Sequence, residues 1–179
     1  QAYPGVLFWR KVVVGDGWCL DWTSCSSEDE HLYQWLFHAD APICDEDGVP
    51  LVIDGGTERL VDNPHITRQR IVGKNCFKGA WVHGTGDVLN VDSVMKAGCR
   101  GDACVFESPD IPTTDSRNGL LMQSRGRDFE LATMFSLNDA PLPRFAHEGD
   151  AMALTIRGND FVLEKGGARP GDLLVLTKP

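Results

Sequence analysis

The sequence has no long hydrophobic run and no excess of basic residues. No apolar stretch in its 179 residues approaches the roughly 20 that span a bilayer, so we expect no membrane-spanning helix and no membrane partner. The chain carries 17 Lys and Arg residues against 26 Asp and Glu residues, a net charge of -9. Binding to nucleic acid needs a basic surface, so this charge argues against a general nucleic-acid partner.

A sustained helical pattern is also missing. No segment repeats apolar residues with a 3.6-residue period between helix caps. Short apolar runs instead alternate with turn formers, as at Gly15-Asp16-Gly17 and Gly84-Thr85-Gly86-Asp87. Many short strands at such intervals are typical of a β-sandwich or a jelly roll. We therefore expect an all-β fold, an antiparallel and jelly-roll-like β-sandwich, as a single domain over residues 1–179.

Closely spaced cysteine pairs are absent as well. No C-x-x-C pair, the usual mark of a structural zinc site, occurs in the chain. An even number of cysteines favours disulfides in an oxidising compartment, with free core cysteines as the alternative. The first residue, Gln1, fits a mature end after signal removal or a cut inside a longer chain. We expect a secreted or periplasmic protein stapled by at least two disulfides among Cys19, Cys25, Cys44, Cys76, Cys99 and Cys104.

The stretch Val6–Asp40 carries the clearest strand pattern. Val12–Val14 and Trp18–Thr23 flank a tight turn and predict a hairpin. Polar residues 24–30 then lead to a third predicted strand, His31–His38. Strand side chains alternate, so one face of it holds Tyr33, Trp35 and Phe37, and the other holds Leu32, Gln34, Leu36 and His38.

Further along, two runs predict a second hairpin. Gly119–Ser124 and Asp128–Leu137 flank Arg125-Gly126-Arg127, and the second run is apolar on both faces, as in a central strand. Residues 96–119 are rich in turn formers and are expected to form a long loop. The last third predicts consecutive antiparallel strands at Met152–Ile156, Phe161–Glu164 and Leu173–Thr177.

The N-terminal stretch resembles a known family. Its Arg-Lys-Val opening, Asp21 and the residues His31, Tyr33, Trp35 and His38 resemble the β-sandwich domain of heparinase II/III-like, alginate- and heparin-type polysaccharide lyases. That domain normally follows a larger helical catalytic domain, which has no counterpart in this sequence. The family's metal site uses a His-x-His-like segment, and this sequence has no His-x-His, so no metal ligand is carried over.

The resemblance implies a module that lines the cleft for an acidic, uronic-acid polysaccharide. A helical catalytic domain would be its partner, and the joint reaction would be β-elimination, in which a base removes a proton beside the carboxylate. Without that domain, we expect the isolated chain not to cleave uronic-acid polymers efficiently.

His38 is the candidate catalytic residue, because the resemblance places it at a strand end facing the cleft. An imidazole with an unperturbed pKa of about 6.5 can act as acid or base, or hold a sugar hydroxyl. The competing interpretation is a histidine bonded to a loop carbonyl. Gln34 on the same strand face and Asp40 just beyond it are candidate substrate-binding residues.

Four further residues are candidates for binding the substrate. Trp81 lies next to His83 and a Gly-rich turn, and is expected to be an exposed platform for a sugar face. Arg117 and Arg125 offer guanidinium forks that match a uronate carboxylate, although ordinary solvated charge explains them equally well.

No cofactor is assigned from the sequence. His65, His83 and His147 fit no recognised metal spacing. Residues 45–48, Asp-Glu-Asp-Gly, resemble part of a calcium loop without its far ligand, so a structural calcium ion competes with a simple turn.

Three functions are therefore open. The first is carbohydrate recognition, the second is a structural or protein-binding sandwich without a glycan ligand, and the third is a small stand-alone glycan-active enzyme. Exposed aromatic and Arg residues lining one groove would favour the first function. A polar surface with one flat apolar patch would favour the second.

Overall fold

The structure is a computed structural model of the chain, and it describes residues 4–53, 66, 68–109, 116–140, 142–165 and 173–175. Within these residues all regular elements are β-strands, and almost all strand pairs are antiparallel, which confirms the predicted all-β class. No helix in the described residues is long and apolar enough to cross a membrane.

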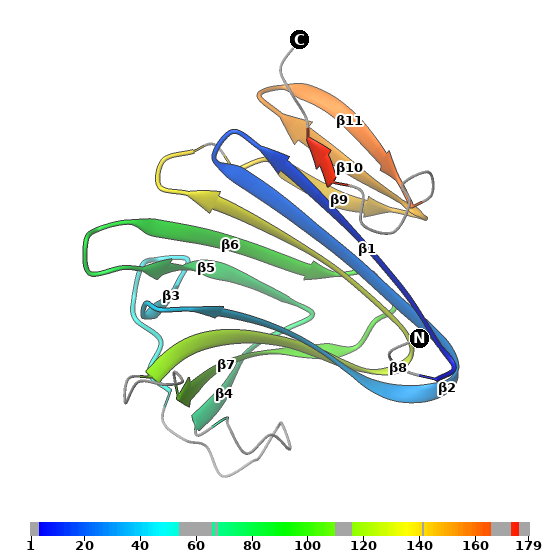
Figure 1. Cartoon of the computed structure of the whole chain (residues 1–179), viewed down its shortest axis with the longest axis horizontal. Coiled ribbons are helices and arrows are strands. Elements are labelled where there is room, and N and C mark those ends of the chain that lie inside the picture. Colours follow the sequence, from blue (N-terminus) through cyan, green and yellow to red (C-terminus); the bar gives the residue numbers. More distant parts are fainter. Residues whose placement is uncertain are drawn as a thin grey trace.

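The described strands form two sheets (Figure 1). The larger sheet contains β1 (Val6–Gly15), β2 (Trp18–Ala39), β3 (Ile43–Asp45), β4 (Arg68–Lys74), β5 (Cys76–Val82), β6 (Val88–Met95), β7 (Gly101–Pro109), β8 (Ser116–Leu137) and β12 (Leu173–Val175). The smaller sheet contains β9 (Arg144–Glu148), β10 (Ala151–Ile156) and β11 (Asn159–Glu164).

Two strands of 22 residues, β2 and β8, organise the larger sheet. They pair from Trp18 opposite Ser136 to Ala39 opposite Asn118, with a register shift between Ser26 and His31. Their ends at Trp18 and Leu137 adjoin β1 and β6, which continue to β5, and this part is called the upper half. Their other ends adjoin β7 and β4, which form the lower half. Both long strands bend between these parts, so the two halves face each other (Figure 1).

The main hydrophobic core fills the space between the two halves. Apolar residues on alternate positions of each strand meet there, because strand side chains point to opposite faces in turn. The buried members include Phe77, Trp81, Val91, Phe129 and Leu131 from the upper half and Tyr33, Ala103, Val105, Leu120 and Met122 from the lower half.

A second core lies on the outer face of the upper half, where the smaller sheet covers it. Trp22 and Met134 are fully buried there against Met152 and Leu154 of β10. The segment Asp128–Leu137 therefore has an apolar core on each face, as predicted for a central strand.

Several predicted elements are confirmed. The β1–β2 and β5–β6 hairpins form across the expected turns, and β10 pairs with β11 as predicted. The alternation along His31–His38 is also right, since Tyr33 is in the core while Leu32 and Leu36 are exposed.

Four local predictions are wrong. Residues 24–30 do not separate two strands, because β2 runs through them with a bend, and Arg125-Gly126-Arg127 is not a hairpin turn, because β8 continues through it beside β2. The expected loop at residues 96–119 contains β7, which pairs with β8. Leu173–Val175 pairs with β1 in parallel, not antiparallel.

The predicted disulfides have no support, since all six cysteines are free thiols in this structure. The alternative of core cysteines fits Cys44 and Cys104, which are buried. Burial raises the pKa of the Cys104 thiol to about 12 and that of Cys25 to about 11. Export was argued partly from these cysteines, so it stays a prediction.

Candidate functional site

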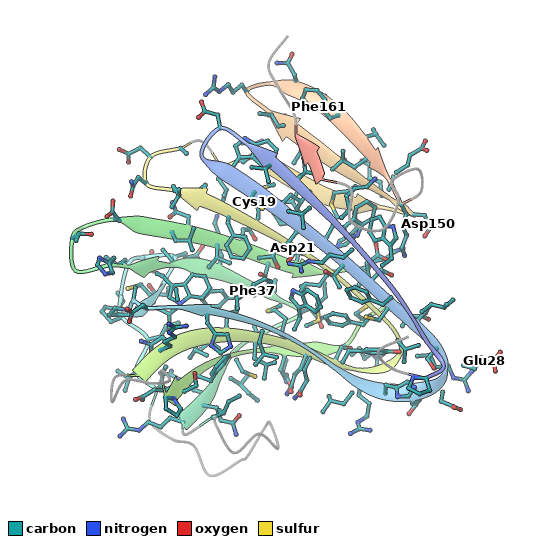
Figure 2. The ribbon with its side chains drawn as sticks, viewed as in Figure 1. Cys19, Asp21, Glu28, Phe37, Asp150 and Phe161 are labelled. Atoms are coloured by element: carbon teal, nitrogen blue, oxygen red, sulfur yellow. The ribbon has the colours of Figure 1, made fainter. Side chains whose placement is uncertain are left out.

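A hollow of about 730 Å³ lies on the outer face of the upper half, next to the bend of β2 and β8. Ser24 and Glu130, which are directly opposite each other on these strands, line it together with Trp9 of β1. Asp150 and Lys165 from the ends of the smaller sheet contribute to its lining, as does the turn at residues 96–100. Figure 2 labels Asp150 at that end of the smaller sheet.

Glu130 is the buried centre of this site. Its carboxylate accepts hydrogen bonds from Trp22 Nε1 at 3.0 Å, from Lys165 Nζ at 2.8 Å and from Lys96 Nζ at 3.3 Å. The Glu130 side chain is only 6% exposed, whereas the two lysines are 27% and 30% exposed. The lysines therefore reach from a buried anion to the surface of the hollow.

His147 on β9 completes the cluster. Its Nδ1 lies 3.5 Å from Glu130 Oε1, an electrostatic contact longer than a good hydrogen bond, and its Nε2 lies 3.3 Å from the carbonyl oxygen of Val94. Because His147 is in β9 and Lys165 directly follows β11, the cluster also ties the smaller sheet to the larger one.

The surroundings of Glu130 keep it ionised. Burial by itself would raise the pKa of this carboxyl group, but contacts from His147, Lys165 and Trp22 outweigh burial and lower the pKa to about 2. At neutral pH the hollow thus contains a fixed buried negative charge.

The rim of the hollow is basic although the protein is acidic. Three acidic side chains line the hollow, those of Asp128, Glu130 and Asp150. Five basic side chains outnumber them, those of Lys96, Arg100, Arg125, Arg127 and Lys165. This local excess of positive charge contrasts with the net charge of -9 for the chain.

Apolar and aromatic side chains lie beside these charges. Leu7 lines the hollow and is 72% exposed, whereas the ring of Phe8 stacks on Trp35 on the other face of the sheet. Trp9 packs edge-on against Trp22, with ring centroids 4.8 Å apart, so its position is fixed by the second core.

Two hydrogen bonds hold the turn at residues 96–100 against β8. Lys96 N donates to the carbonyl oxygen of Glu130 at 2.9 Å, and Ser124 Oγ donates to the carbonyl oxygen of Arg100 at 2.9 Å. The turn is therefore a defined part of the site.

The structure brings only some of the predicted site residues together. Of the predicted site residues, Arg125 lines the hollow. His38 lies on the outer face of the lower half, and Arg125 is opposite Leu32, six residues from His38 along β2. At 3.3–3.4 Å per residue this is about 20 Å.

His38 and Arg117 do lie near each other. Burial of His38 and the charge of Arg117 both lower the pKa of the imidazole. Its ring packs edge-on against Phe106 at 5.0 Å, and Gln34 on the same face donates a hydrogen bond to Gln123 Oε1 at 3.1 Å. Asp40 is exposed just beyond β2. These residues form a surface distinct from the hollow.

The expectation that Trp81 is an exposed platform is wrong. Its side chain is 2% exposed in the main core, and its Nε1 donates to the carbonyl oxygen of Asn118 at 3.3 Å. Trp81 is still within β5, four residues after the buried Phe77, so strand alternation places both side chains on the face toward the core. His83 lies in the exposed β5–β6 turn, where its Nδ1 is 2.9 Å from Thr85 Oγ1.

The other acidic and histidine candidates give no metal cluster. Asp45 Oδ1 accepts hydrogen bonds from the backbone of Asp47 and Val49, as in a simple turn. Within the described part of the chain, no group of three or more His, Cys, Asp or Glu side chains is placed to hold a metal ion. His65 lies outside the described residues.

The sequence interpretation missed the residues at the centre of the hollow, namely Lys96, Glu130, His147 and Lys165. One signal was available, because Glu130 is a lone charge within the otherwise apolar run from Phe129 to Phe135. A charged residue inside a central strand needs a partner. The two lysines and His147 could not be identified as its partners, because they lie 17 to 35 residues away.

Comparison with known proteins gives no relative: no family model, no curated protein and no solved structure matches this chain.

Proposed function

We propose that this chain is a carbohydrate-recognising β-sandwich module that binds an acidic polysaccharide in the hollow. The observation that carries the proposal is that basic side chains and the partly exposed ring of Trp9 line the same hollow. This combination is what a groove for an acidic glycan requires.

The chemistry of the lining suits a uronic acid. The guanidinium groups of Arg100, Arg125 and Arg127 match the two oxygens of a carboxylate, and the lysines add point charges. Leu7 and Trp9, which point to the same face of β1, offer apolar surface to the faces of sugar rings. One charged hydrogen bond contributes about 1.5–3 kcal/mol, so two or three of them contribute about 3–9 kcal/mol, which corresponds to millimolar to micromolar binding.

The charge pattern also favours selectivity. An acidic protein repels polyanions in general, and a local basic hollow directs them to one place. The resemblance to the sandwich domain of polysaccharide lyases supports the same ligand class, with a helical domain supplying the elimination chemistry. In that setting the module would work outside the cytoplasm, where such polymers are found.

Titration calorimetry with alginate, heparan and hyaluronan oligosaccharides tests the proposal. Arg125→Ala and Arg127→Ala are each expected to weaken binding about tenfold, the loss of one charged hydrogen bond. Arg144→Ala is the matched control, because Arg144 is exposed on β9 and does not line the hollow. Equal binding by all three variants would show that the hollow is not the site.

The competing function is a structural or protein-binding module. Leu32 and Leu36 are 44% and 36% exposed on the outer face of the lower half, where Ile71 is also exposed, and such residues suit a protein contact. If the parent protein binds no member of the glycan panel, this function takes precedence.

A further inference from the structure

We propose that Asp150 occupies the carboxylate-binding position of the hollow in the unliganded protein, and that a uronate displaces it from Lys96. Asp150 would then act as an internal competitor that sets the affinity for acidic sugars. This inference rests on the proposed function of the hollow.

The position of Lys96 suggests the exchange. Its Nζ lies 3.3 Å from Glu130 Oε2 and 3.3 Å from Asp150 Oδ1, so one ammonium group bridges two carboxylates. The two carboxylates differ greatly in environment, because the side chain of Glu130 is 6% exposed and that of Asp150 is 86% exposed. The ammonium group of Lys96 therefore contacts the buried carboxylate of Glu130 on one side and the exposed carboxylate of Asp150 on the other.

Only the exposed carboxylate can be replaced easily. Glu130 is also held by Lys165, Trp22 and His147, whereas within the described residues Lys96 is the one cation in ion-pair contact with Asp150. An exposed ion pair is worth about 0–1 kcal/mol. A uronate that contacts Lys96 and also the arginines lining the hollow would gain more binding free energy than this ion pair contributes.

The exchange requires only the side chain of Asp150 to move, because its main chain is held by a hydrogen bond. Asp150 follows Gly149, which has a φ of 62° in the β9–β10 turn, and the carbonyl oxygen of Asp150 accepts a hydrogen bond from Lys165 N at 3.2 Å. This bond fixes the main chain, so a rotation of the Asp150 side chain is enough to free the outer side of Lys96.

The decisive variant is Asp150→Asn, which removes the competing charge at an exposed position. We expect it to bind uronate oligosaccharides about three- to fivefold more tightly than the parent, since this corresponds to losing an exposed ion pair. Asp139→Asn is the matched control, because it changes the net charge equally in the exposed turn that follows β8, and Asp139 does not line the hollow. Lys96→Met should lose binding about tenfold.

The ligand provides a second control. A galacturonate oligosaccharide and its methyl-esterified form share the sugar chain, but only the first carries carboxylates. The gain in Asp150→Asn is expected for the acid and absent for the ester, as measured by calorimetry at constant ionic strength. A gain that appears equally with the ester, or equally in Asp139→Asn, would overturn the competition.

The possible failures are distinguishable. If the parent binds the acid but Asp150→Asn binds it no better, then Asp150 is not a competitor and the function of the hollow stands. If neither the parent nor Asp150→Asn binds any acidic oligosaccharide, the proposed function fails and this inference fails with it.

Discussion

Asp21 and Glu130 are two buried carboxylates on neighbouring strands, and they lie on opposite faces of the same sheet. Asp21 is on the face toward the main core, and Glu130 is on the face toward the smaller sheet. The residues are 4% and 5% exposed, and buried charges of this kind are normally paired with a cation. They obtain their cations in different ways.

Asp21 has a single partner with a rigid shape. Arg10 donates from Nε at 2.9 Å and from Nη2 at 2.8 Å, which is a bidentate fork, and this bond raises the pKa of the guanidinium. The Arg10 group also lies 5.1 Å from the ring centre of Trp35, and Trp35 stacks on Phe8 at 5.9 Å. The pair thereby links the upper half to the lower half, at the side where Figure 2 shows Asp21 and Phe37.

Glu130 has several partners that come from distant elements. Two lysines, His147 and Trp22 surround it, and both lysines remain partly exposed at the hollow. The comparison shows that an arginine fork uses its geometry to close a structural contact. Flexible lysines around one buried anion leave positive charge available at a surface.

The largest expected effect comes from neutralising the two carboxylates in turn. Glu130→Gln should lower the free energy of unfolding by about 3 kcal/mol, because it leaves a cluster of cations without its anion. Asp21→Asn should cost about 1–2 kcal/mol, because Arg10 is 46% exposed and can return to water. Chemical denaturation measures both values.

Matched conditions make this comparison sharper. Both substitutions keep the size of the side chain and raise the net charge by one, so a general charge effect cancels between them. If Asp21→Asn destabilises the protein more than Glu130→Gln, the view that the Glu130 cluster is the stronger electrostatic contact is wrong.

The second prediction concerns pH. The pKa of Glu130 is lowered from 4.5 to about 2 in the folded protein, so its stabilising effect is complete above pH 4.5 and is lost as the pH falls toward 2. The difference in unfolding free energy between the parent and Glu130→Gln should therefore shrink by up to about 3 kcal/mol between pH 5 and pH 2.

Unfolding curves of both proteins at several pH values in that range measure this effect. The other carboxylates titrate in both proteins, so they cancel in the difference. A difference that stays constant down to pH 2 would mean that Glu130 is not held in its ionised form by the fold.

The smallest expected effect comes from exchanging arginine and lysine at the two sites, which tests whether the bidentate geometry of Arg10 matters for stability. Arg10→Lys should cost about 1 kcal/mol, because lysine keeps the charge but loses the bidentate geometry and the contact of the guanidinium with the ring of Trp35. Lys96→Arg should change stability by less than about 0.5 kcal/mol, because Lys96 contacts Glu130 through one atom and is partly exposed. Thermal or chemical unfolding measures both values. If the two substitutions lower the free energy of unfolding equally, the bidentate geometry of Arg10 has no special role.

Much of the fold could be predicted because strand patterns are local. Tyr33 and Leu32 were assigned to the correct faces, and the β1–β2 and β5–β6 turns were placed correctly. The candidate site was predicted less well. Arg125 is part of the hollow, but His38 lies elsewhere. His38 is six residues along β2 from Leu32, the residue opposite Arg125, which is about 20 Å at 3.3–3.4 Å per residue.

The alternation of apolar and polar residues determined the all-β class and the face of each side chain, because this period depends only on neighbours in the sequence. The tertiary structure decided that β2 and β8 run unbroken through polar segments, since pairing of the two strands resumes on both sides of the register shift. It also decided that Lys96, His147 and Lys165 meet Glu130. Burial of that one carboxylate requires cations. The packing of the smaller sheet on the larger one supplies His147 and Lys165, and the turn between β6 and β7 supplies Lys96.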